Sequence, residues 1–370
     1  MRSLILLIVT AAVPAFAQER QIPFDSGWTY SPADLHSVGP FLGRESLRLR
    51  NTVALRSDVS LEDGTIDFDL AVTGHRSFAY IQFRQTAEGE NEEIYIRPHK
   101  TNLPDAVQYA PVFRGQSAWQ LFHGPGYTAR VPIARGEWIH VRLVIQGQRA
   151  AFYLGDTTRP VMVVPRLARP AAPGAIALRA FTPADGGAPE GEYVAAYSNL
   201  VVRPGVVPAV FPEAPARPRP AGLVTAWQLS PAFVPPRGRL RALPADLLAG
   251  RASWPSRPVD EEGRLILDRY LARPGQDARA AAVLRLVVPA DRDTVRRLDL
   301  GFSDEYLLFV NGRPVAGGEA AYRFDNPRGD GVLHINQSVA YLPLRKGENE
   351  VLIVLLDVFG GWGLLGALEQ

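Results

Sequence analysis

The 370-residue sequence contains no cysteine. This absence excludes disulfide bonds, thiolate metal sites, cysteine nucleophiles and attachment of a lipid through an N-terminal cysteine. The fold must therefore be stabilised by packing alone, and any catalysis would have to use oxygen or imidazole groups. With 46% hydrophobic residues the chain can build a core, and its length favours two domains over one.

The sequence also lacks a block of one charge. Its 40 basic and 38 acidic residues nearly balance, and no Lys/Arg-rich run could follow a phosphate backbone, so nucleic acid is not expected as a partner. Several enzyme motifs are missing too: Gly-x-Ser-x-Gly, His-Glu-x-x-His, the phosphate loop and the dinucleotide fingerprint. The six histidines include no i,i+2 or i,i+4 pair, so a histidine metal site would have to be assembled from distant strands.

The first 17 residues are typical of a secretory signal. Arg2 precedes an apolar run from Leu4 to Val13, and Ala15-Phe16-Ala17 supplies the small residues of a cleavage site before Gln18. The alternative is an uncleaved anchor, but the run is shorter than the ~20 residues that span a bilayer. No later segment is apolar enough to cross one. We therefore expect a periplasmic or secreted protein with no membrane insertion after signal cleavage.

The pattern of apolar residues predicts short strands throughout the chain. The 33 glycines and 32 prolines favour turns over long helices. Period-2 alternation predicts half-buried strands in the first region over 65–72, 78–84, 93–97, 138–145, 150–154, 175–181 and 193–202. In the second region we expect strands over 281–288, 295–300, 305–310, 341–344 and 350–358, a hairpin at Asn311-Gly312 and a short helix over 240–248.

Six prolines between Arg203 and Gly222 predict an extended, semi-rigid connector. The expected organisation is a signal peptide over 1–17, a first domain over 18–204, a Pro-rich linker over 205–222 and a second domain over 223–370. Short strands without a helical period between them indicate antiparallel sandwiches. The predicted fold class is all-β, with two antiparallel β-sandwich (jelly-roll) domains joined by the linker.

One polar surface stands out as the candidate ligand-binding site. It combines outward positions of two predicted neighbouring strands with residues of the following loop. Planar amide, carboxylate and guanidinium groups can bind vicinal hydroxyls while aromatic rings cover the C–H faces of a sugar. Alternatives are a solvated sheet face with paired charges and a protein interface. The candidate ligand-binding residues are Gln82, Arg84, Glu93, Tyr95, Arg97, His99, Gln108, Tyr109 and Trp119, with Asp105 nearby.

The first region also resembles a known superfamily. The segments IYIRPH (94–99), LPDAVQYAPVF (103–113), AWQL (118–121) and GEWIHVRLVIQGQRAAFYLGD (136–156) resemble the concanavalin A-like/laminin G jelly rolls, including exported domains of the 3-keto-disaccharide hydrolase type. The resemblance covers about residues 24–204. It implies a two-layer sandwich with a glycan- or glycoside-binding sheet, and it is compatible with a structural calcium ion. For Asp63, Asp67 and Asp69 we expect turn and solvent-facing strand chemistry instead of calcium binding.

The catalytic pattern of laminarinase-type members is missing, because Glu-x-Asp occurs nowhere in the chain. Glu88, Glu90 and Glu92 alternate, but we read them as a loop between strands. Retaining hydrolysis with two carboxylates is therefore not expected. Chemistry on an oxidised sugar needs one base beside a keto group. Glu93, His99 and His123 could each serve as that base.

The second region resembles the galactose-binding-like β-sandwich in GFSDEYLLFVNGRPV (301–315) and LPLRKGENEVLIVLLDVFGGWG (342–363). For Phe359 and Trp362 we expect a role in the core or between the domains, and not as a stacking platform for a sugar. No cofactor is expected. The first hypothesis is an exported glycan- or glycoside-binding protein with a carbohydrate ligand. A hydrolase or lyase of 3-keto glycosides and a structural or adhesion module are the alternatives, and the sequence leaves open whether the protein is an enzyme.

Overall fold

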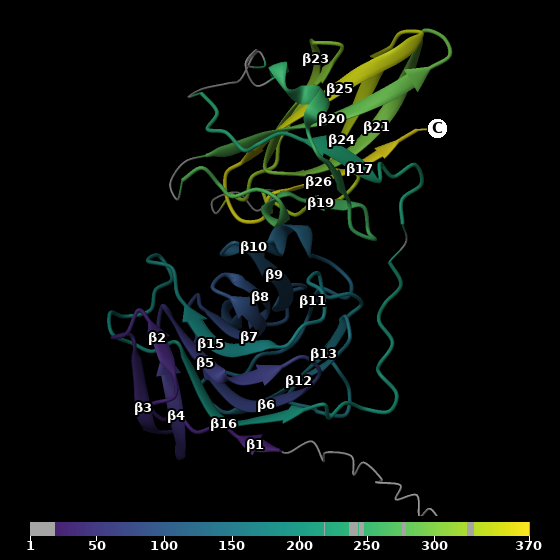
Figure 1. Ribbon diagram of the computed structural model, residues 1–370. Coiled ribbons are helices and arrows are strands. Elements are labelled where there is room, and N and C mark those ends of the chain that lie inside the picture. The colour runs from purple at the N-terminus through teal and green to yellow at the C-terminus, as the bar shows by residue number, and fades with distance from the viewer. Residues whose placement is uncertain are drawn as a thin grey trace, which may run out of the picture.

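The computed structural model describes residues 19–217, 219–236, 243, 248–275, 279–323 and 329–369. The predicted signal peptide lies outside these ranges, and so does most of the predicted helix over 240–248. All pairings between named strands are antiparallel, and the strands form four sheets in two sandwiches (Figure 1). The predicted fold class, all-β with two antiparallel jelly-roll sandwiches, is confirmed.

The N-terminal sandwich consists of two eight-stranded sheets. Sheet 1 contains, in order, β14 (Met162–Val164), β13 (Arg149–Leu154), β12 (Ile139–Gln146), β6 (Gly64–Val72), β16 (Ala195–Pro204), β4 (Arg44–Leu49) and β3 (His36–Phe41), with β1 (Arg20–Gln21) paired to β16. Sheet 2 contains β10 (Gln116–Ser117), β9 (Val107–Phe113), β8 (Glu90–Ile96), β7 (Phe78–Ala87), β15 (Gly174–Phe181), β5 (Thr52–Leu61) and β2 (Thr29–Ser31), with β11 (Thr128–Ala129) paired to β9. This two-sheet architecture agrees with the jelly roll that the resemblance implied.

The C-terminal sandwich consists of a six-stranded and a four-stranded sheet. Sheet 3 contains β18 (Ser256–Pro258), β17 (Ala226–Leu229), β20 (Ala280–Ala290), β25 (Gly347–Asp357), β22 (Glu305–Val310) and β23 (Arg313–Glu319). Sheet 4 contains β19 (Arg264–Ile266), β26 (Gly363–Leu368), β21 (Thr294–Ser303) and β24 (Ser338–Leu344). Four short 3₁₀ helices complete the named elements: η1 (Pro98–Lys100), η2 (Trp119–Leu121), η3 (Arg251–Ser253) and η4 (Leu267–Arg269).

Alternating apolar residues place the core between the sheets. In β6, Ile66, Phe68 and Leu70 are at most 1% exposed and belong to the core of the N-terminal sandwich. The second core centres on Trp227 and Trp362, which are fully buried. The described part of the linker runs as an extended trace along one side of the molecule, from β16 up to the C-terminal sandwich (Figure 1).

Three details of the sequence reading are corrected. Glu90 and Glu92 do not lie in a loop but in β8, and Glu92 points into the core, where its carboxylate accepts a hydrogen bond from the Tyr109 hydroxyl. Asp67 and Asp69 do not face solvent, because arginine and histidine side chains of neighbouring strands cover them. The sequence reading also missed several strands. Gln108 and Tyr109, which it placed in a loop, lie in β9, and β3, β4 and β5 were not predicted. It also missed β26, which carries Gly363 and Gly366 and shows no period-2 pattern.

Candidate functional site

Aromatic side chains gather on the face of sheet 2 that points away from the core. Tyr80 on β7 lies opposite Tyr95 on β8, with ring centroids 5.2 Å apart, and Phe78 lies 6.3 Å from Tyr80. Phe181, at the end of β15, lies 5.8 Å from Phe78, and the Trp119 side chain packs against the same cluster. We call Phe78, Tyr80, Tyr95, Trp119 and Phe181 the aromatic row.

Amide and carboxylate groups beside the aromatic row form two hydrogen-bonded groups. Gln82 donates to one oxygen of Glu93 at 3.0 Å, and the Ser117 hydroxyl donates to the other at 2.8 Å. The Gln108 carbonyl oxygen accepts from the Tyr95 hydroxyl and from Arg97, both at 2.8 Å. Because each group has a partner, the network holds the sheet face in one arrangement.

The charged groups at one end of the row are also paired. Arg97 lies 3.0 Å from Asp105, and Lys100 donates to the same carboxylate at 2.5 Å. Burial would raise the pKa of Asp105, but Arg97 and Lys100 outweigh it and hold the pKa below its usual value. Burial lowers the pKa of His99 to about 4, with Arg97 and Lys100 adding to the effect. The His99 imidazole is therefore neutral at pH 7.

Seven of the nine predicted ligand-binding residues lie on or beside this face, and two do not. Tyr109 was placed on the polar face, but it points from β9 into the core, because it is adjacent in the strand to Gln108, which faces outward. Arg84 leaves the face because its φ of 51° interrupts the alternation of β7, and its guanidinium binds Asp63 and the carbonyl of Gly147. These two residues are corrections to the predicted site.

The predicted face is also less accessible than a solvated sheet surface. The side chains of Gln82, Glu93, Arg97 and Gln108 are at most 6% exposed. The half-buried groups that a ligand could reach are Phe78, His99, Trp119, Arg179 and Phe181. The sequence reading missed Phe78, Arg179 and Phe181. Alternation over 175–181 already places Arg179 and Phe181 on one face of a strand. The sequence does not show that this strand pairs with β7, which brings both residues to the aromatic row.

A cation completes the far end of the row. The Arg179 guanidinium lies 4.7 Å from the centroid of the Tyr80 ring and 6.0 Å from that of Phe181. At the other end, Trp119 lies 5.6 Å from Tyr322 and 6.4 Å from Phe359 of the C-terminal sandwich. The aromatic surface thus continues from one sandwich onto the other.

Gln120, next to Trp119, fixes this continuation. It is fully buried and donates from its side-chain amide to the carbonyl of Phe359 at 2.7 Å and to Asp304 at 3.2 Å. Its side-chain oxygen accepts from the Gly361 amide, and its backbone carbonyl accepts from Leu333 at 3.0 Å. The neutral side chain of Gln120 therefore joins two segments of the C-terminal sandwich to η2.

Glycines make this close approach feasible. A Cβ atom on Gly360 would lie 2.0 Å from the side-chain oxygen of Gln120. One on Gly361 would lie 2.7 Å from the Cα atom of Ala118, and one on Gly363 would lie 2.8 Å from the Leu121 side chain. Trp362 between them is buried, and half-exposed Phe359 lies at the contact between sandwiches. Trp362 therefore has the expected core role, and Phe359 makes the expected interdomain contact with Trp119 while about half of its surface stays exposed.

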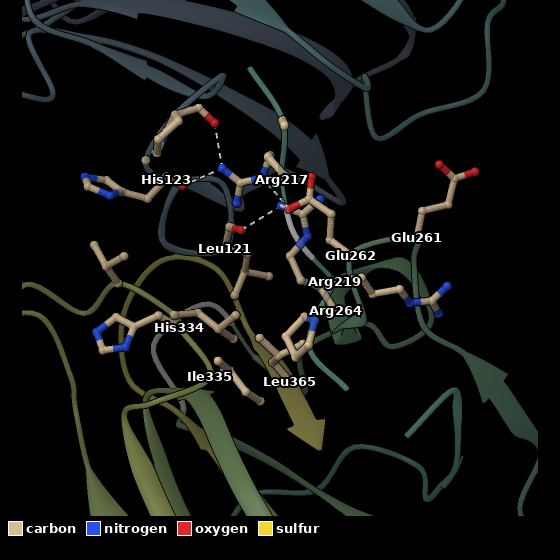
Figure 2. A pocket seen from close by; sticks show the side chains of 16 residues that line it. Leu121, His123, Arg217, Arg219, Glu261, Glu262, Arg264, His334, Ile335 and Leu365 are labelled. Carbon is tan, nitrogen blue, oxygen red and sulfur yellow. Dashed lines mark hydrogen bonds and ion pairs between the residues drawn. The ribbon is translucent and has the colours of Figure 1, made fainter. Parts of the chain in front are cut away.

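Two cavities lie where the sandwiches meet, and Arg264 lines both. The histidine cavity has a volume of about 390 Å³. Figure 2 shows Arg217, Glu262 and Arg264 close together, while the rings of His123 and His334 lie on one side of the cavity. Arg217 donates to Glu262 at 2.8 Å, and Arg264 donates to the carbonyl of Leu121 at 3.0 Å. Arg217 and Arg264 therefore already have hydrogen-bond partners inside the protein, which Figure 2 marks by dashed lines.

The second cavity, which we call the arginine cavity, has a volume of about 650 Å³. Its lining includes five arginines, namely Arg114, Arg166, Arg169, Arg264 and Arg269, and three carboxylates, namely Glu90, Asp260 and Glu261. It shares no residue with the aromatic row. The two sites are therefore separate.

The described residues contain no group of three or more histidine, aspartate or glutamate side chains arranged to hold a metal ion. Asp63, for which calcium binding was the alternative, accepts hydrogen bonds from Arg84 and from the Gly147 amide. Within the described ranges there is also no helix with the length and apolar character needed to cross a membrane.

The core carboxylate of Glu92 gives a pH-dependent prediction. Burial raises the pKa of Glu92 to about 7, and hydrogen bonds from Tyr109 and Arg169 offset only part of this. The unfolded chain has the lower pKa, so between about pH 4.5 and 7 the folded state binds more protons, and stability falls as the pH rises through this window. We expect Glu92→Gln to reduce the loss of unfolding free energy between pH 5 and 8 by on the order of 2 kcal/mol, measured by chemical denaturation. A variant with the same slope as the wild type would contradict this assignment.

No family model matches the sequence, and no curated protein matches it. Several solved structures are similar to about half of the chain. One is a carbohydrate-binding module CBM66 from Bacillus subtilis, which is 17% identical and has a TM-score of 0.36; the match covers 50% of this chain and 99% of that chain. A native glycosidic hydrolase matches at 16% identity over 54% of this chain and 100% of its own, with a TM-score of 0.37. A β-1,3-1,4-glucanase (lichenase) from a mouse hindgut metagenome matches at 14% identity over 51% and 99%, with a TM-score of 0.37. TM-scores this low carry no argument about function, and the fold assignment rests on the sheets described above.

Proposed function

We propose that the protein binds a glycan or glycoside along the aromatic row, without transforming it. The observation that carries the proposal is the row itself: five aromatic side chains pack on one sheet face, and Phe78, Trp119 and Phe181 are half-buried and accessible there, next to the half-buried Arg179 guanidinium. Aromatic rings stack on the apolar C–H faces of sugar rings, and polar neighbours bind the hydroxyls. The predicted export would place this binding in the periplasm or outside the cell.

The hydrogen-bond network favours binding of this kind. Gln82, Glu93 and Gln108 are already held by partners inside the protein. The row therefore loses little conformational freedom when a ligand stacks on it, which lowers the entropic cost of association. The neighbouring rings of Tyr322 and Phe359 extend the stacking surface, so we expect an extended chain of sugars to bind more tightly than a single unit.

Hydrolysis receives less support from the same geometry. On this face, the Glu93 carboxylate forms no ion pair with a described residue. It is nevertheless 1% exposed, and both of its oxygens accept hydrogen bonds. Asp105 is paired with Arg97 and Lys100. Retaining hydrolysis requires two carboxyl groups about 5–5.5 Å apart that reach the substrate. We therefore favour binding over hydrolase or lyase chemistry.

The double variant Phe78→Ala/Phe181→Ala tests the proposal. A glycan array identifies the ligand with the wild-type protein, and titration calorimetry then compares the variants. Each lost stacking contact is worth about 0.5–1.5 kcal/mol, so we expect affinity to fall about tenfold. Phe41→Ala is the matched control, because Phe41 is a half-buried aromatic residue on β3 of sheet 1 that packs against Trp138. Equal affinity of the double variant and the control would remove the row from consideration.

A further inference from the structure

We propose that the arginine cavity between the two sandwiches binds a small ligand through its carboxylate or sulfate group. This site goes beyond the aromatic row, since the two share no residue. Its volume of about 650 Å³ falls within the range of about 300–1,000 Å³ that is usual for small-molecule sites. Both sandwiches contribute to it, so it exists only while they are docked.

The charges of the cavity do not balance. Arg169 pairs with Glu90, Arg166 with Glu261 at 2.9 Å and Arg264 with Asp260 at 2.7 Å. These three pairs use every carboxylate of the lining. Arg114 and Arg269 remain, and neither forms an ion pair with any residue that the structure describes.

Contacts with neutral groups hold these two side chains in place. Arg269 donates to the carbonyl of Ala168, and its guanidinium lies 5.1 Å from the Phe113 ring centroid. The Arg169 guanidinium lies 5.2 Å from the same ring. Arg114 donates to the backbone carbonyl of Arg269 at 3.4 Å, which keeps its guanidinium beside Arg269. Two arginines without an ion-pair partner among the described residues thus line the same cavity of ligand size.

This arrangement determines the chemistry of the ligand. A guanidinium offers planar pairs of N–H donors, which match the oxygens of a carboxylate or sulfate group. Arg114 is exposed and Arg269 is half-buried, so both have donors left for an incoming anion. A neutral ligand would leave the two charges uncompensated.

Titration calorimetry at low salt tests the site with three probes: trigalacturonic acid, which carries carboxylates, inorganic sulfate, and neutral maltotriose. We expect one or both anions to bind and affinity to fall as salt rises, because screening weakens the charge interaction. If only trigalacturonic acid binds, the recognised group is a carboxylate. If only sulfate binds, the recognised group is a sulfate. We expect Arg114→Gln and Arg269→Gln each to weaken binding about tenfold. Arg130→Gln is the control, since Arg130 is exposed and also donates to a backbone carbonyl, that of Asn102.

Arg114→Gln keeps the test independent of folding, because among the described residues the Arg114 side chain makes a single hydrogen bond, the long one to the Arg269 carbonyl. Failure of both anions to bind at millimolar concentration overturns the proposal, and so does equal affinity of Arg114→Gln and Arg130→Gln. If the anions bind but Phe78→Ala/Phe181→Ala abolishes their binding, the ligand sits on the aromatic row, and the cavity site is wrong while the proposed function stands.

Discussion

Arg264→Met is expected to destabilise the protein by about 3–5 kcal/mol, because it removes one partner of a buried ion pair. The Arg264 side chain is 6% exposed and donates to Asp260 at 2.7 Å, to the carbonyl of Leu121 and to the Tyr127 hydroxyl. Its guanidinium lies 3.9 Å from the centroid of the Phe122 ring. Without it, the Leu121 carbonyl loses its donor inside the interface, and the Asp260 carboxylate keeps its two backbone N–H partners but no cation.

Guanidinium chloride unfolding followed by tryptophan fluorescence measures this loss. Arg292→Met is the control, since Arg292 is exposed, and surface changes of this kind usually stay within about 0.5 kcal/mol. The double variant Arg264→Met/Asp260→Asn should recover part of the loss, because it removes the unpaired charge. A single variant within about 1 kcal/mol of the wild type would show that the pair contributes little.

Gln120→Ala is expected to cost about 3–4 kcal/mol, because it removes the partner of the buried Gly361 amide and of the partly buried Phe359 carbonyl, and a buried polar group left without a partner costs about 1–3 kcal/mol. These two groups belong to the C-terminal sandwich, whereas Gln120 belongs to the N-terminal one. The loss should therefore weaken docking more than it weakens either core. We expect calorimetric scanning to show one unfolding transition for the wild type and two for the variant, and protease cleavage in the linker to become faster.

Gln116→Ala is the matched control for this prediction, because Gln116 is a half-buried glutamine of neighbouring β10. Gln120→Glu provides a second variant of nearly the same volume. It replaces the amide donors with a carboxylate near Asp304, so we expect it to weaken docking at least as much as alanine does. Docking that survives both changes would falsify the role assigned to this side chain.

The sequence predicts the strands of this protein well where one face is apolar. The strand over 65–72 appears as β6, and Asn311-Gly312 forms the turn between β22 and β23. Alternation fails where apolar residues stand on both faces of a strand or where a residue interrupts it. The sequence of β9 is Val-Gln-Tyr-Ala-Pro-Val-Phe, with apolar residues on both faces, so hydrophobicity could not tell that Tyr109 points inward. At Arg84 a left-handed φ turns the side chain off the face, and nothing in its residue type signals this.

The candidate site was predicted only in part for a related reason. Residues of predicted strands could be assigned to a face, but the neighbour of a strand depends on contacts distant in sequence. Arg179 lies opposite Tyr80, about one hundred residues earlier in the chain, and this pairing is what adds β15 to the aromatic row. Gln120 is an uncharged residue with no motif, and its partners lie 184–241 residues away. Its role becomes visible only when both sandwiches are in place.

The glycines at 360, 361 and 363 have a consequence for comparing this chain with others. Each one faces a different part of the segment 118–121, and a methyl group at any of them would meet an atom closer than 3 Å. A side chain at these positions is not compatible with this docked arrangement, and at Gly360 the φ of 84° disfavours one as well. The pattern Gly-Gly-Trp-Gly, together with a glutamine that follows tryptophan in the first sandwich, is therefore a signature by which homologues that keep the two halves joined can be recognised.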